Sequence, residues 1–160
     1  MVEPRILLLD TGPLRELILY AAVRDLGYSR LQQEMSFLKT AKNYENLTAF
    51  ISLFRQRVTT PHVVSEVSAW IIRTIEGGRP LFWSLVFDEL TRMEMNEETI
   101  ALLRMAPELV ASLGATDVSL LKVAANFPPG TSLLLSVDDA LVKQCKNAGL
   151  LALHLWEVID

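Results

Sequence analysis

Four carboxylates that lie far apart in the chain stand at positions that could form one reactive site. They are Asp10, Glu66, Asp117 and Asp138. Each follows an apolar segment typical of a buried strand or lies in the first turns of an expected helix. Two carboxylates about 4 Å apart repel by roughly 4 kcal/mol at an effective dielectric constant of about 20. If the fold brings all of them into one cleft, we expect them to take up protons or to bind a cation.

The residue types in this set favour Mg²⁺ or Mn²⁺ as the cation. An all-oxygen ligand set suits these ions, whereas zinc prefers nitrogen and sulfur ligands. The chain has only two histidines, His62 and His154, and one cysteine, Cys145. Mg²⁺ and Mn²⁺ keep several waters, bind substrate phosphates and lower the pKa of an attacking water. The chemistry that these carboxylates predict is hydrolysis of a phosphodiester bond by a metal-activated water.

Each acid also has a purely structural explanation. An aspartate at a helix start is a common N-cap, and a glutamate in the first turn suits the helix dipole. The shared site depends on the elements that position the acids. We expect strands at residues 5–9, 57–59, 91–95, 132–136 and 150–155. We expect helices at residues 13–24, 45–55, 60–76, 80–90 and 138–147, one that Thr116 or Asp117 caps and that reaches about residue 126, and one that Asn96 caps and that reaches about residue 103. We expect residues 25–42 to form a loop or short helices.

This alternation of strands and helices predicts an α/β fold, a three-layer α/β/α sandwich with a mostly parallel central sheet, in one domain over residues 1–160. In such sheets ligands bind at the carboxyl ends of the strands. The strands before Asp10 and Asp138 end at that edge, and the helices that carry Glu66 and Asp117 start there. The predicted fold therefore brings the acids to one edge of the sheet.

The composition excludes several function classes. Of the 160 residues, 51% are hydrophobic and 21% are charged, as in a compact domain with a core. The net charge of −4 argues against a protein that coats nucleic acid through bulk charge, so RNA binding would need a local basic rim. The sequence contains no uncharged apolar run of about 18 residues, and Asp10 ends the first apolar run too early for a signal peptide. We expect a cytoplasmic protein without a membrane span.

Four segments resemble the motifs of PIN-domain nucleases, a family that includes the VapC-type toxins. Residues 6–14, Ile-Leu-Leu-Leu-Asp-Thr-Gly-Pro-Leu, resemble the opening motif, and residues 60–68, Thr-Pro-His-Val-Val-Ser-Glu-Val-Ser, resemble the second. Residues 113–121, Leu-Gly-Ala-Thr-Asp-Val-Ser-Leu-Leu, and 134–141, Leu-Leu-Ser-Val-Asp-Asp-Ala-Leu, resemble the third and fourth. The segments occur in the family's order and span nearly the whole chain.

The resemblance implies a PIN-like fold and a metal-dependent endoribonuclease that hydrolyses RNA with Mg²⁺ or Mn²⁺. If the protein is the toxin of a toxin–antitoxin pair, an antitoxin protein is a further partner. The resemblance assigns catalysis and metal binding to the four acidic residues, Asp10, Glu66, Asp117 and Asp138. It makes Thr11 and Ser136 supporting hydroxyls that hydrogen-bond the carboxylates or the scissile phosphate.

The fourth motif departs from the family pattern at two positions. Ser136 stands where threonine is commoner, which keeps the hydroxyl. Asp139 follows Asp138 where a basic or polar residue is common, so either aspartate could face the metal. We favour Asp138 because it lies two residues after Ser136.

Two other functions and an assembly state are also considered. A non-catalytic PIN-fold module that binds RNA or protein is the alternative, but such a module has no need of four repelling acids. An aspartyl phosphatase is a third possibility, but its chemistry usually needs a second acid two residues after the nucleophilic aspartate, and Gly12 stands at that position after Asp10.

The apolar stretch at residues 81–87 exceeds what we expect one small domain to bury, so we expect a homodimer.

Overall fold

The computed structural model describes residues 3–75, 79–92, 95–97 and 107–160. It is a three-layer α/β/α sandwich, as predicted, around a five-stranded parallel sheet in the order β3-β2-β1-β4-β5. The strands are β1 (Ile6–Leu9), β2 (Gln56–Thr59), β3 (Met95–Glu97), β4 (Ser132–Ser136) and β5 (Leu151–His154). β1 is wholly apolar and β4 has an apolar centre of three leucines, because both faces of a parallel sheet are covered by helices.

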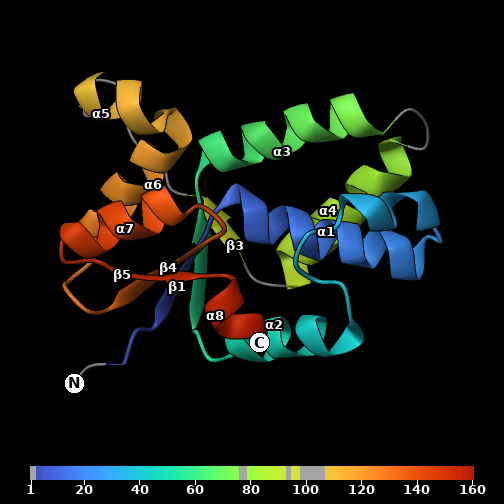
Figure 1. Ribbon diagram of the computed structural model, residues 1–160, viewed down its shortest axis with the longest axis horizontal. Coiled ribbons are helices and arrows are strands. Elements are labelled where there is room, and N and C mark those ends of the chain that lie inside the picture. Colours follow the sequence, from blue (N-terminus) through green and yellow to red (C-terminus); the bar gives the residue numbers. More distant parts are fainter. Residues whose placement is uncertain (1–2, 76–78, 93–94, 98–106) are drawn as a thin grey trace.

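Helices lie above and below the strands in Figure 1, with α6 and α7 above β4 and β5, and α2 and α8 below. The helices are α1 (Thr11–Asp25), the 3₁₀ helix η1 (Ser29–Glu34), α2 (Ala41–Ser52), α3 (Pro61–Thr74), α4 (Arg79–Arg92), α5 (Pro107–Leu113), α6 (Ala115–Asn126), α7 (Asp139–Asn147) and α8 (Trp156–Ile159). None of the helices in the described part of the chain is long and apolar enough to cross a membrane.

The pairing of β1 with β4 decides which residues meet at the carboxyl edge of the sheet. Leu9 pairs with Leu135, so the next residues along the two strands, Asp10 and Ser136, lie side by side. The Asp10 backbone N–H donates to the Leu135 carbonyl over 3.1 Å. On the other side of β1, Leu8 pairs with Val58, which brings the end of β2 to the same edge.

Several predicted boundaries are wrong, for identifiable reasons. Helix α6 starts earlier than expected because Gly114, with a φ of +91°, is its N-cap; Asp117 therefore lies in the first turn. Asn96 does not cap a helix but pairs with Val58 in β3, and Thr91, expected in a strand, lies in α4. In both cases tertiary pairing or packing overrides a local preference. The rest of the helix expected after Asn96 falls at residues 98–106, outside the described residues.

Candidate active site

The first turn of α1 packs closely against the loop that follows β4. Asp10 is the N-cap of α1, and its Oδ1 accepts a 2.6 Å hydrogen bond from the Thr11 N–H. A Cβ atom on Gly12 would overlap the side chain of Val137, so only glycine allows this approach. The turn Asp-Thr-Gly therefore places the acid that ends β1 beside the residues that follow β4.

The Asp10 carboxylate is buried, with 6% of the residue exposed. Its Oδ2 accepts a 2.6 Å hydrogen bond from Ser136 Oγ. Burial raises the pKa of Asp10, and the hydrogen bonds from Ser136 and Thr11 lower it without cancelling that effect. The charges of Glu66 and Asp138 raise the pKa further, so both carboxylates lie within electrostatic reach of Asp10.

Two threonine hydroxyls hold Glu66 from opposite sides. Thr11 Oγ1 on α1 donates to Glu66 Oε2 over 2.8 Å, and Thr116 Oγ1 on α6 donates to Glu66 Oε1 over 2.7 Å. These bonds connect α3 to both neighbouring helices. The supporting role predicted for Thr11 thus corresponds to a direct contact with Glu66. The sequence predicts Thr116 only as a possible helix cap, although its place directly before Asp117 is a signal that could have identified it as a partner of the acidic residues.

Asp117 is the carboxyl group on which the other three acids act together. The residue is half-buried in the first turn of α6. Burial, followed by the charges of Asp10, Asp138 and Glu66, raises its pKa to about 7. Since each of these three charges changes the pKa of one carboxyl group, the four predicted acids lie near enough to interact electrostatically. We call Asp10, Glu66, Asp117 and Asp138 together the acidic neighbourhood.

Asp138 and Asp139 have different surroundings. Asp138 caps α7 through Oδ1, which accepts from the N–H groups of Ala140 (2.7 Å) and Leu141 (3.1 Å). Its Oδ2 makes no hydrogen bond within the part of the chain that the structure describes. The Asp139 side chain is 97% exposed, and its Oδ1 lies 3.9 Å from His154 Nε2. Asp138, and not Asp139, is among the charges that raise the pKa of Asp10 and Asp117.

The acids are close enough to interact electrostatically but do not form a ready-made cage. Among the residues that the structure describes, no three or more His, Cys, Asp or Glu side chains are grouped so that they could hold a metal ion. The mutual effects of the acids on their pKa values agree with this absence of a metal-holding group, because charge interactions reach further than a coordination bond of about 2.0–2.6 Å. Mg²⁺ is usually held by one or two carboxylates and several waters, so the donor set fits a largely hydrated ion.

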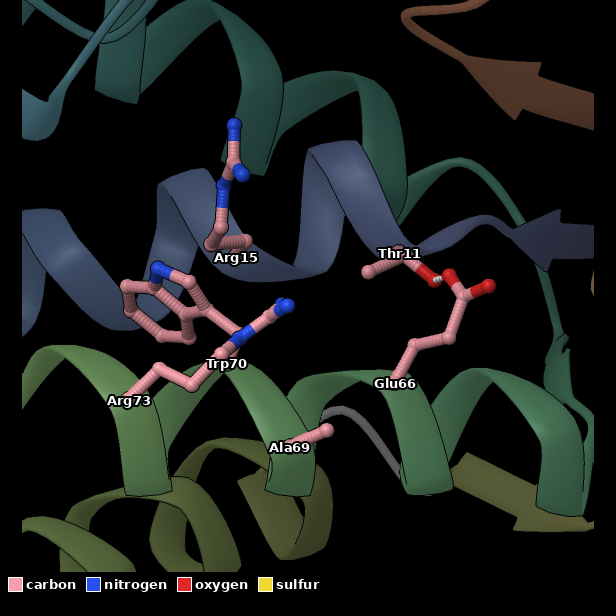
Figure 2. Close-up of a pocket in the computed structure, with 6 residues that line it drawn as sticks. All are labelled: Thr11, Arg15, Glu66, Ala69, Trp70 and Arg73. Atoms are coloured by element: carbon pink, nitrogen blue, oxygen red, sulfur yellow. Dashed lines mark hydrogen bonds between the residues drawn. The ribbon is translucent and has the colours of Figure 1, made fainter.

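A cleft of about 410 Å³ opens beside Glu66. Figure 2 shows that it lies between α1 and α3, whose side chains line it: Thr11, Arg15, Glu66, Ala69, Trp70 and Arg73. The cleft shares Thr11 and Glu66 with the acidic neighbourhood. It therefore continues that neighbourhood toward the two arginines.

Comparison with models of known protein families and with curated proteins gave no match to this chain. The resemblance to PIN-domain nucleases therefore remains a prediction that depends on the four motifs. A function for this chain is therefore inferred from the position and chemistry of its acidic residues.

Proposed function

We propose that this protein is a divalent-metal-dependent ribonuclease of the PIN-domain type, which hydrolyses phosphodiester bonds of RNA. The observation that carries the proposal is the placement of the acidic residues at the carboxyl edge of the sheet, where Ser136 holds Asp10, and Thr11 and Thr116 hold Glu66. Burial and the charges of the other three acids raise the pKa of Asp117 to about 7, in agreement with this placement. A protein that keeps such repulsion at the carboxyl edge of a parallel sheet, where ligands bind in this class of fold, gains from a bound cation.

Mg²⁺ or Mn²⁺ would be held directly by one or two of the carboxylates of Asp10, Asp117 and Asp138, and by the remaining ones through bound water. When bound, such an ion polarises a phosphate and lowers the pKa of a water molecule. Glu66 would complete the site, directly or through bound water, with its carboxylate held in place by two hydroxyl hydrogen bonds. Ser136 holds the Asp10 carboxylate in place, and Thr11 does the same for Glu66.

The experiment is cleavage of an end-labelled single-stranded RNA by the purified protein with Mg²⁺, with Mn²⁺ and in EDTA. We expect metal-dependent cleavage that leaves 5′-phosphate and 3′-hydroxyl ends, because water and not the 2′-hydroxyl attacks. Asp10→Asn and Asp117→Asn should each lower the rate by roughly 100-fold or more, since each weakens the charge that holds the ion. Asp139→Asn is the matched control, because that side chain is exposed and lies outside the acidic neighbourhood.

Two results would contradict the proposal. Cleavage that persists in EDTA, or that leaves 2′,3′-cyclic phosphates, would rule out metal-activated water. RNA binding without cleavage in either metal would instead support the non-catalytic module. A cognate antitoxin, the partner expected of a toxin, would be identified as a protein that abolishes cleavage when both are mixed.

We also propose that the protein forms a homodimer through the outer face of α4. One face of this helix is buried in the core through Phe82 and Val86, which are 0% and 2% exposed. Leu81 and Phe87 on the outer face are 54% and 61% exposed. Light scattering should give the mass of a dimer, and Phe87→Ser should shift it to that of a monomer. A monomer mass for the unmodified protein at micromolar concentration would contradict the dimer.

A further inference from the structure

The cleft between α1 and α3 carries two positive charges next to the acidic neighbourhood. Arg15 is half-buried on α1 and Arg73 is exposed in the last turn of α3. In Figure 2 the Arg73 side chain extends along the cleft in the direction of Glu66, while the Arg15 side chain leaves α1 with its guanidinium group pointing away from α3 in this view. An otherwise acidic protein, with a net charge of −4, therefore has a local pair of cations at its candidate active site.

The guanidinium groups of these arginines have few partners among the described residues. Arg15 Nε is shielded from solvent and has no hydrogen-bond partner in that part of the chain. Within residues 3–75, 79–92, 95–97 and 107–160, the Arg73 side chain makes no hydrogen bond or ion pair. Among the described residues Glu66 forms no ion pair with either arginine, and its two oxygens accept hydrogen bonds from Thr11 and Thr116. A guanidinium group presents five N–H donors in a rigid fork that matches phosphate, so the exposed Arg73 side chain is available to an anion, and Arg15 adds a second positive charge to the wall of the cleft.

Simpler roles account for only part of this arrangement. Arg15 lies over the Trp70 ring, with its Cζ 5.9 Å from the ring centroid, which is a favourable cation–π distance. Arg73 suits the C-terminal end of the α3 dipole. Neither interaction satisfies the guanidinium N–H groups. Trp70 is only 8% exposed and has Arg15 above it, so a base has no open aromatic face there on which to stack.

We propose that Arg15 and Arg73 form a subsite for a backbone phosphate of the RNA strand, next to the bond that is cleaved. This inference rests on the nuclease proposed above. A strand whose scissile phosphate lies at the acidic residues would pass Glu66 and enter the cleft. Because the contacts go to phosphate and no base stacks on Trp70, the subsite positions the strand without reading its sequence.

Binding is tested separately from cleavage by using the Asp10→Asn protein in millimolar Mg²⁺ with a fluorescent single-stranded RNA. Adding Arg15→Gln or Arg73→Gln should each raise the Kd by about tenfold, the scale of one charge-assisted phosphate contact. Each should also lower the slope of log Kd against log salt concentration by about 0.7. Arg30→Gln is the matched control, because Arg30 is an exposed arginine in η1 outside the cleft. Arg15→Lys keeps the charge and should lose less affinity than Arg15→Gln.

A scan of single methylphosphonate linkages, each of which removes one phosphate charge, locates the contact. One linkage should weaken binding of the Asp10→Asn protein, yet cause no further loss when Arg73→Gln is also present. Unchanged Kd and salt slope in all the cleft variants would overturn the subsite, even if the protein cleaves RNA. Arginine-dependent binding without any cleavage would support the subsite and reject the nuclease. Displacement of the RNA by poly-glutamate with the same arginine dependence would assign the cleft to an acidic protein and overturn the phosphate assignment.

Discussion

Ser136 Oγ donates a 2.6 Å hydrogen bond to Asp10 Oδ2, which joins the ends of β4 and β1 across 126 positions of the chain. The same hydroxyl accepts a 3.0 Å hydrogen bond from the Asp138 backbone N–H. One serine therefore connects a buried carboxylate to the backbone of a second acid. The pairing of Leu9 with Leu135 is what makes this contact geometrically available.

Removal of the Ser136 hydroxyl should destabilise the protein. Ser136→Ala takes away a hydrogen bond to a buried carboxylate, which should lower the free energy of unfolding by about 1.5–3 kcal/mol at neutral pH. Ser132→Ala is the matched control: it lies on the same strand, is 7% exposed, and its hydroxyl has no hydrogen bond to a described residue. Urea denaturation measures the free energy of unfolding of both variants. Equal losses in the two variants would show that the bond to Asp10 contributes nothing.

The neighbouring aspartates Asp138 and Asp139 should respond differently to substitution. Asp138→Ala removes the cap of α7 and should cost about 1 kcal/mol, together with most of the proposed activity. Asp139→Ala changes an exposed side chain and should cost less than about 0.5 kcal/mol. Thermal denaturation and the RNA cleavage rate check both variants. If Asp139→Ala abolishes cleavage while Asp138→Ala spares it, the fourth motif has been aligned one residue out of place.

Gly12→Ala should destabilise the protein, although alanine is the better helix former. In an open helix the exchange would stabilise by up to about 1 kcal/mol. Here the new methyl group overlaps Val137, and overpacking of this kind costs about 1–3 kcal/mol. Gly12→Ala combined with Val137→Ala should recover part of the loss. A stabilised Gly12→Ala variant would contradict the close approach of α1 to the loop after β4.

The sequence predicted the layers of the fold and the positions of the acids better than it predicted the contacts between them. The apolar strand over residues 132–136 and the cap at Asp138 are confirmed because strong local signals coincide there. The short helices α5 and α8 were not predicted; at 7 and 4 residues they carry too little periodicity.

The segment between α1 and α2 shows why local patterns were insufficient. Glu16 is 0% exposed, although its sequence context is that of an ordinary helix residue. Its carboxylate accepts 2.9 Å hydrogen bonds from the N–H groups of Ser36, Phe37 and Leu38, which fixes a stretch expected only as a loop or short helices. These contacts across 20 to 22 positions, and the contact of Thr116 with Glu66 across 50 positions, depend on tertiary placement that no local pattern encodes.

The stability of the metal-free protein should fall as the pH rises from about 4 to about 7. The pKa of Asp117 is raised from its ordinary value of 3.8 to about 7, so in this range the folded protein binds more protons than the unfolded chain does. The free energy of unfolding therefore decreases with pH across this window and levels off above it. The raised pKa of Asp10 acts in the same direction.

Asp117→Asn should flatten the dependence of the free energy of unfolding on pH and, at pH 8 in EDTA, raise the Tm by about 2–4 °C for each kcal/mol of relieved repulsion. Millimolar Mg²⁺ should raise the Tm of the unmodified protein more at pH 8 than at pH 5, because protons compete with the ion, and Asp117→Asn should lose most of that gain. Asp139→Asn, with the same change of charge on an exposed side chain, should keep both the pH profile and the response to Mg²⁺. Calorimetry in EDTA and in Mg²⁺ across this pH range measures these effects, and a Tm that ignores Mg²⁺ at pH 8 would count against a shared cation site.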